Sequence, residues 1–167
     1  MELTNTINIW ISALDNYDID QLRIQPTPGS WSMGQLYTHL LLDTRFYLDQ
    51  VTSCANSDTN TQEPLAEKGK FILFHGFPDM RIEGHPDNHL IPQPESRLLL
   101  LNEMKNLREE VERAIKTVEQ NNPAGKTSHP DPAIGYFNAK EWLQFASKHF
   151  EHHLRQKKRI DDFLCVW

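Results

Sequence analysis

Two histidines near the C-terminus, His149 and His153, have the spacing that most directly suggests chemistry. They are four residues apart, so on a helix they lie one turn apart on the same face. The other members of that face are apolar: Trp142, Phe145, Ala146, Ile160 and Phe163. Neutral imidazoles are common ligands of zinc and similar divalent metals. Hydrogen-bonded core histidines would also explain the pair, which by itself leaves both interpretations open.

A third histidine, His39, could complete such a site. It lies in an apolar stretch that predicts a buried helix, far from the pair in sequence. Three histidine ligands leave coordination positions open on a metal, which is typical of catalytic sites. Asp43 follows His39 by one turn and is the catalytic candidate. Its carboxylate could orient His39, contact a metal-bound water, or satisfy a neighbour in the core.

The element that carries the pair is one long amphipathic helix, predicted from Asn138 to Cys165. Asn138 can cap its start, and Glu141 completes a pattern resembling a capping box. Apolar residues at helical spacing predict three further helices, which cover residues 3–16, 31–54 and 94–121. The segment 55–93 is long and irregular, and its apolar run Phe71–Phe74 could be a strand fragment or a buried loop anchor.

This arrangement predicts the fold class all-α: a four-helix bundle with a long crossover loop between helices two and three. The chain has 167 residues, which is enough for a substantial core. It shows no internal repeat and no low-complexity tract. We therefore expect a single domain over residues 1–167.

Composition argues against several classes of function. A net charge of −6 and a pI of about 5.7 argue against nucleic-acid binding. No apolar stretch approaches the length needed to span a membrane, and the N-terminal stretch has no signal-peptide pattern. A disulfide between Cys54 and Cys165 is one alternative, but a reduced cytoplasmic protein is the simpler interpretation.

The remaining histidines have simpler explanations. His152 falls on the edge of the helical stripe, so we expect it at the rim of the site or in solvent. His129, which precedes Pro130, is expected to position the start of the last helix through a hydrogen bond. Three histidines are expected on loops or at the surface: His75, His85 and His89.

Three stretches in series resemble the DinB/YfiT-like superfamily of metal-binding four-helix bundles: GSWSMGQLYTHL, HPDPAIGYFNAKEW and HFEHHLRQ. The matching elements are Trp31-Ser32 ahead of His39, His129-Pro130 with Gly135 ahead of Trp142, and His149 and His153 followed by Gln156. The likeness covers nearly the whole chain. It implies a divalent-metal triad of His39, His149 and His153, and a homodimer. The family also includes transferases and isomerases that use low-molecular-weight thiols.

The leading hypothesis is a metal-dependent enzyme, although the sequence leaves open whether there is turnover. A metal held by three neutral imidazoles can lower the pKa of a bound water or thiol. By analogy with the family we favour transfer of a small-molecule thiol to an electrophilic small-molecule substrate. The alternatives are a hydrolase using metal-bound hydroxide, a non-catalytic metal-binding stress-response module, and a bundle with packed, metal-free histidines. We expect zinc or nickel.

Overall fold

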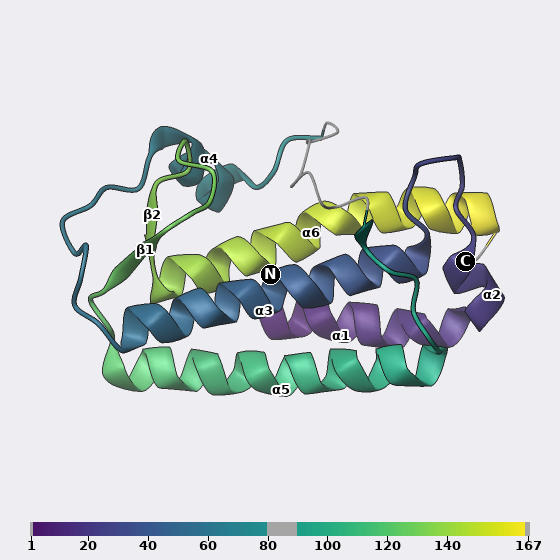
Figure 1. Cartoon of the computed structure of the whole chain (residues 1–167), viewed down its shortest axis with the longest axis horizontal. Coiled ribbons are helices and arrows are strands. Elements are labelled where there is room, and N and C mark those ends of the chain that lie inside the picture. The colour runs from purple at the N-terminus through teal and green to yellow at the C-terminus, as the bar shows by residue number, and fades with distance from the viewer. Residues whose placement is uncertain (1, 80–89, 166–167) are drawn as a thin grey trace.

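The computed structural model describes residues 2–79 and 90–165, and four helices lie side by side along its long axis (Figure 1). These helices are α1 (Leu3–Ala13), α3 (Met33–Ala55), α5 (Arg97–Asn121) and α6 (Ala139–Leu164). Helix α3 packs against α5 and α6, and α1 closes the bundle against the same two helices. The predicted four-helix bundle is confirmed. Among the described residues, no helix is long and apolar enough to cross a membrane.

Short elements connect the first two long helices. A turn of 3-10 helix, η1 (Leu14–Asn16), extends α1 and accounts for the predicted end of the first helix at residue 16. Helix α2 (Ile19–Arg23) follows and packs against α3.

The two helices that carry the three histidines begin at side-chain caps. At the start of α3, Ser32 Oγ accepts a hydrogen bond from Gln35 N, and Gln35 Oε1 accepts one from Ser32 N, both at 3.1 Å. Asn138 and Glu141 form the same reciprocal pair at α6, at 2.9 and 2.8 Å, as predicted. These bonds satisfy N–H groups that the first helical turn leaves unpaired. Both helices therefore begin at residues that the sequence specifies.

Aromatic side chains fill much of the space between the helices. The Trp10 ring meets Tyr37 edge-on at 5.0 Å and Phe150 at 6.2 Å, and Tyr37 donates a hydrogen bond to the Trp10 carbonyl oxygen at 2.7 Å. Trp142, predicted as a core residue, is fully buried and donates from Nε1 to Thr127 Oγ1 at 2.8 Å. Close packing of this kind holds α1, α3 and α6 at fixed separations.

The crossover between α3 and α5 contains a helix that the sequence did not predict, α4 (Glu67–His75). The apolar run Phe71–Phe74 lies within it, so the prediction of a strand fragment is wrong. Its middle residues Ile72 and Leu73 are buried, and its two phenylalanines are exposed. Helix α4 packs against α6, where Gln144 Nε2 donates to the Leu73 carbonyl oxygen at 3.0 Å. The run therefore anchors the crossover through only two of its four side chains.

An antiparallel hairpin, also not predicted, precedes α6. Its strands are β1 (Lys126–Ser128) and β2 (Tyr136–Asn138), and β2 runs directly into α6. Gly135 has a φ of +87°, and a Cβ there would lie 2.5 Å from Ala66 N. Leu65 pairs with Gly135 in a single β-bridge. The hairpin and the crossover are thus joined at one end of the bundle, where Figure 1 shows them beside α4.

Candidate metal centre

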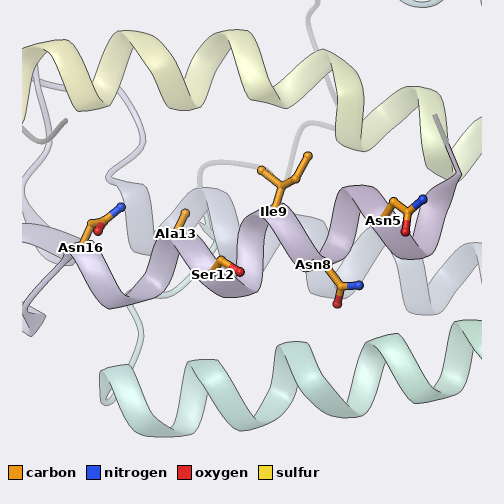
Figure 2. Close-up of a pocket in the computed structure, with 6 residues that line it drawn as sticks. All are labelled: Asn5, Asn8, Ile9, Ser12, Ala13 and Asn16. Carbon is orange, nitrogen blue, oxygen red and sulfur yellow. The ribbon is translucent and has the colours of Figure 1, made fainter.

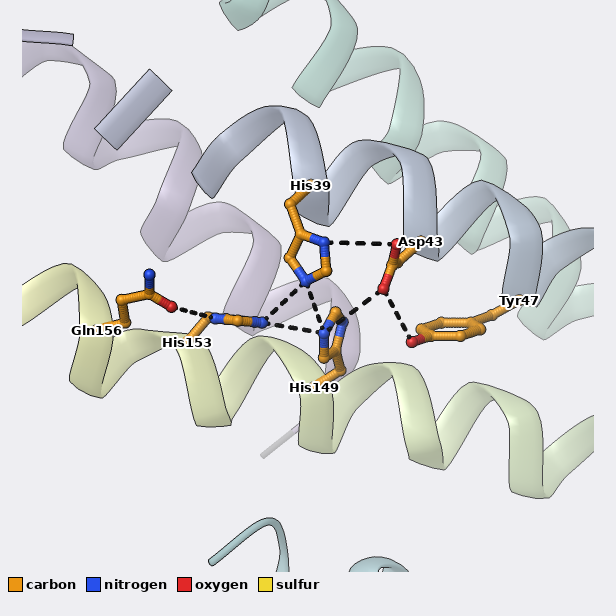
Figure 3. A network of polar contacts seen from close by, with 6 residues as sticks. All are labelled: His39, Asp43, Tyr47, His149, His153 and Gln156. Atoms are coloured by element: carbon orange, nitrogen blue, oxygen red, sulfur yellow. Dashed lines mark hydrogen bonds and ion pairs between the residues drawn. The ribbon is translucent and has the colours of Figure 1, made fainter. Parts of the chain in front are cut away.

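Three histidine side chains converge between α3 and α6 (Figure 3). The Nε2 atom of His39 lies 3.1 Å from that of His149 and 3.1 Å from that of His153, and the last two are 3.0 Å apart. The three residues are only 5%, 7% and 6% exposed. Their nitrogens form a group that could hold a metal ion. The predicted convergence is confirmed, and binding of a metal by these rings stays a prediction.

The backbone explains why the rings meet. His149 and His153 are one turn apart on the face of α6 that packs against α3, and α3 and α6 are neighbours along most of their length. His39 lies in the first half of α3, between the buried residues Leu36 and Leu40. Two capped helices therefore bring together ligands that are 110 residues apart in sequence.

The outer nitrogens of two rings face hydrogen-bond acceptors. Gln156 Oε1 lies 2.9 Å from Nδ1 of His153, and Asp43 Oδ1 lies 3.5 Å from Nδ1 of His39. The amide oxygen of Gln156 accepts a hydrogen bond, so Nδ1 of His153 carries the proton and its Nε2 presents a lone pair to the centre. Partners of this kind commonly orient histidines that bind metals. Among the described residues, Nδ1 of His39 and Nδ1 of His149 make no hydrogen bond.

Burial keeps the three rings neutral. Loss of solvent lowers the pKa of His39 to about 4 and that of His153 to about 3, and it lowers the pKa of His149 well below the usual value. Repulsion from neighbouring histidines lowers the three pKa values further. Since metals bind the neutral ring, the triad is ready to act as a ligand set at neutral pH.

The donor set fits a divalent cation. Bonds from zinc to histidine nitrogen are about 2.0–2.1 Å, so one ion can bridge nitrogens up to about 4 Å apart. With the proton of His153 on Nδ1, its Nε2 faces the other two Nε2 atoms as a lone pair at about 3 Å. A cation at the centre would be bound by that lone pair and by those of His39 and His149. The free thiols Cys54 and Cys165 are not part of the group.

Asp43 lies beside the triad, as the sequence predicted. Its Oδ2 atom is 3.8 Å from His149 Nε2 and accepts a hydrogen bond from the Tyr47 hydroxyl at 3.4 Å (Figure 3). Burial and the charge of Asp43 raise the pKa of Tyr47 well above its usual value, so the hydroxyl keeps its proton. The Asp43 side chain is 36% exposed. It can therefore contact His39 from one oxygen and a reacting group from the other.

Two partly exposed aromatic rings border the triad, in addition to the buried ring of Tyr47, which lies 5.7 Å from that of His149. The Trp31 ring lies 4.6 Å from that of His39 and 6.4 Å from that of His153, and the Phe77 ring lies 6.0 Å from that of His149. Sequence reasoning noted Trp31 only as part of the family pattern and gave Phe77 no role. Phe77 follows α4 in an irregular stretch, where no periodic pattern could have pointed to the site.

Arg155 on α6 fixes the segment that carries Phe77. Its Nη2 atom donates to the carbonyl oxygens of Phe77 at 2.9 Å and Pro78 at 3.3 Å, and its Nε lies 3.4 Å from Asp79 Oδ1. The same Nη2 lies 2.9 Å from Nδ1 of His152. His152 is half-buried at the rim of the site, as predicted. Arg155 thus ties the end of the α4 segment to the helix that bears the histidine pair.

The remaining histidines stand apart from the triad. Nδ1 of His129 accepts a hydrogen bond from Asp131 N at 2.9 Å, and its ring stacks on Trp142 at 5.7 Å. These contacts agree with a role in positioning the start of α6. His75 is exposed, but it ends helix α4 and does not lie in a loop, so the loop prediction is wrong. Two histidines expected at the surface lie outside the described residues: His85 and His89.

A hollow of about 460 Å³ lies away from the triad, on the outer face of α1 (Figure 2). Its lining consists of small and amide side chains and one isoleucine: Asn5, Asn8, Ile9, Ser12, Ala13 and Asn16. None of these side chains titrates or binds metals strongly. The hollow offers no chemistry comparable to that of the triad.

Comparison with known proteins supports the fold and the family. A family model described as the DinB superfamily matches residues 2–156. A solved structure of YfiT from Bacillus subtilis, described as a probable metal-dependent hydrolase with an unusual four-helix bundle topology, is similar with a TM-score of 0.59. The two chains are 14% identical, and the match covers 99% of this chain and 85% of that one. A search of curated proteins finds no match.

Proposed function

We propose that this chain, which belongs to the DinB superfamily, is a divalent-metal-dependent enzyme centred on His39, His149 and His153. The observation that carries the proposal is the meeting of three Nε2 atoms within 3.1 Å of one another. Their rings are neutral, and the outer nitrogen of His153 is oriented by Gln156. Three ligands from the protein leave positions for a water or a substrate, as in catalytic zinc sites.

The chain itself supplies binding, orientation and a proton acceptor. A divalent cation bound by the triad would supply positive charge that lowers the pKa of a water or thiol. Asp43 Oδ2, 3.8 Å from His149 Nε2, is placed to accept the proton that such a nucleophile loses. The Tyr47 hydroxyl donates to the same Asp43 oxygen at 3.4 Å, and its ring meets that of His149 edge-on at 5.7 Å.

Hydrolysis of an ester or amide is the first reaction that we propose. The partly exposed carboxylate of Asp43 supports it, because water is a weak acid and gains more from a nearby base than a thiol does. The description of YfiT as a probable metal-dependent hydrolase points to the same reaction class in a protein of similar fold.

Transfer of a small-molecule thiol to an electrophile is the second reaction. It follows from the likeness to family members that use such thiols. The donor set supports it as well, because three neutral imidazoles leave the full charge of the cation to attract a thiolate.

Metal binding and turnover can be tested in one set of proteins. Protein stripped with a chelator is titrated with Zn²⁺ or Ni²⁺, and we expect one ion per chain. His149→Ala should weaken binding by more than about tenfold. His75→Ala, which changes an exposed histidine on α4, is the matched control and should bind normally. Wild-type affinity in His149→Ala would refute the triad as the binding site.

Turnover is then measured on an ester and amide panel, and on electrophiles with and without added thiol. Hydrolysis that needs the metal and no thiol identifies the first reaction, and product formation that needs both identifies the second. Stoichiometric metal without turnover on either panel would instead support a metal-binding module.

We also propose a zinc or nickel ion, a small-molecule substrate, a single domain over residues 1–167, a homodimer and a cytoplasmic location. Native mass spectrometry of the purified protein would measure both the bound metal and the number of chains.

A further inference from the structure

Aromatic rings from two separate segments flank the triad, and neither belongs to the proposed ligand set. We infer that the site takes a ligand carrying a flat apolar group beside its metal-binding atoms. Trp31 and Phe77 would contact that group. This inference rests on the proposed function, because the metal-binding atoms of the ligand need a metal.

Trp31 is anchored at the edge formed by His39. Its ring lies 4.6 Å from the His39 ring and remains partly exposed. The next residue, Ser32, caps α3 and also donates from Oγ to Gln93 Oε1 at 2.8 Å. The backbone that carries Trp31 is therefore fixed at its C-terminal side by the hydrogen bonds of Ser32.

Phe77 is anchored at the edge formed by His149. Its ring is 6.0 Å from that of His149 and 5.4 Å from that of Phe145, which is buried beneath it. Arg155 holds the Phe77 carbonyl oxygen at 2.9 Å. Like Trp31, Phe77 is partly exposed, so both rings can meet a ligand without first leaving the core.

The charges near Phe77 argue against a strongly anionic group at this position. Arg155 lies beside this segment, but its charge is paired with Asp79, and its Nη2 donates to the carbonyl oxygens of Phe77 and Pro78. Asp43 adds a negative charge beside the triad. An apolar ring, in contrast, gains from edge or offset contacts with aromatic faces, by about 3- to 10-fold in affinity.

The test compares two hydroxamates, which bind metals through the same pair of oxygens and differ in their substituent. Zinc-loaded protein is titrated with benzohydroxamate and with acetohydroxamate by calorimetry. We expect benzohydroxamate to bind about 3- to 10-fold more tightly. The ratio of the two dissociation constants, acetohydroxamate over benzohydroxamate, should fall toward 1 in Phe77→Leu and in Trp31→Leu. Both variants keep an apolar side chain.

Phe74→Leu is the matched control, since this phenylalanine is 81% exposed on α4 and has no ring contact with the triad. Its ratio should equal that of wild type. The two ligands also differ in acidity, but that difference is the same for every variant. A change of the ratio between variants therefore reports contact with the protein. A wild-type ratio near 1, or one that neither variant changes, would overturn the inference. A wild-type protein that takes up neither zinc nor nickel would instead overturn the proposed function.

Discussion

The side chain of Gln156 holds His153 from the side away from the triad, with its Oε1 atom 2.9 Å from Nδ1 of the ring. The two residues are three positions apart on α6, so the helix itself sets this contact. Because the contact fixes which nitrogen of His153 carries the proton, it determines whether Nε2 can act as a ligand.

Replacing Gln156 by leucine should therefore weaken metal binding. Without an acceptor at Nδ1, His153 can place its proton on Nε2, and we expect the dissociation constant to rise by about tenfold. Gln156→Glu retains an acceptor oxygen and should bind nearly as wild type. Calorimetric titration with Zn²⁺ measures all three proteins. Equal zinc affinities in Gln156→Leu and wild type would show that Gln156 does not orient His153.

Metal should stabilise the folded chain through the triad. A ligand at 100 times its dissociation constant contributes about 2.7 kcal/mol, which is about 5–10 °C in Tm for a chain of this size. Thermal unfolding with and without Zn²⁺ should show this increase in wild type and in His75→Ala. His39→Ala should show almost none. An increase of equal size in His39→Ala would mean that the ion binds elsewhere.

Asp43→Asn should separate binding from turnover. Asparagine keeps an oxygen that can face His39, so metal affinity should fall by less than about tenfold. It cannot accept a proton as a carboxylate does, and kcat should fall by about 10²- to 10⁴-fold. Asp49→Asn, on the exposed side of α3, is the control. Unchanged kcat in Asp43→Asn would exclude this carboxylate as the base.

Alkaline pH should unfold the protein, in part through Tyr37. Its hydroxyl is buried and bonded to Trp10, and burial raises its pKa well above 10. In the unfolded chain tyrosine ionises near pH 10. The contribution of the buried, neutral hydroxyl to the free energy of unfolding is therefore complete below that pH and is lost as the pH rises above it. The loss is about 1.4 kcal/mol per pH unit. Urea unfolding of wild type and Tyr37→Phe at pH 8 and 11 should show a smaller alkaline loss in the variant.

Gly135 should tolerate no side chain. Gly135→Ala would combine a positive φ with a Cβ that lies 2.5 Å from Ala66 N, and we expect a loss of about 3 kcal/mol. Gly29 also has a positive φ, +78°, but a Cβ there would meet nothing within 4 Å. Gly29→Ala should therefore cost only about 1 kcal/mol. Chemical denaturation compares the two, and equal losses would show that the close contact with the crossover has no effect.

The sequence predicted those parts of the fold that depend on local patterns. The cap at Asn138 and the spacing of His149 and His153 lie within one element, and both were confirmed in position. The helical stripe is buried as far as Ile160, but its last predicted member, Phe163, is 51% exposed near the end of α6, so that part of the prediction is wrong. His39 was found because it stands in an unusually apolar helix. The hairpin was missed because its strands have three residues each, too few to show an alternating pattern. Phe77 was missed because only the tertiary contact with Arg155 brings it to the site.

The division of the triad between α3 and α6 has a consequence for synthesis on the ribosome. His39 is translated early, whereas its two companions belong to α6, which follows the other three long helices in the chain. No three-histidine centre can assemble on a nascent chain until α6 has emerged and docked. Loading with metal would thus mark chains in which α6 is complete, and a polypeptide that stops before α6 would be left without the ion.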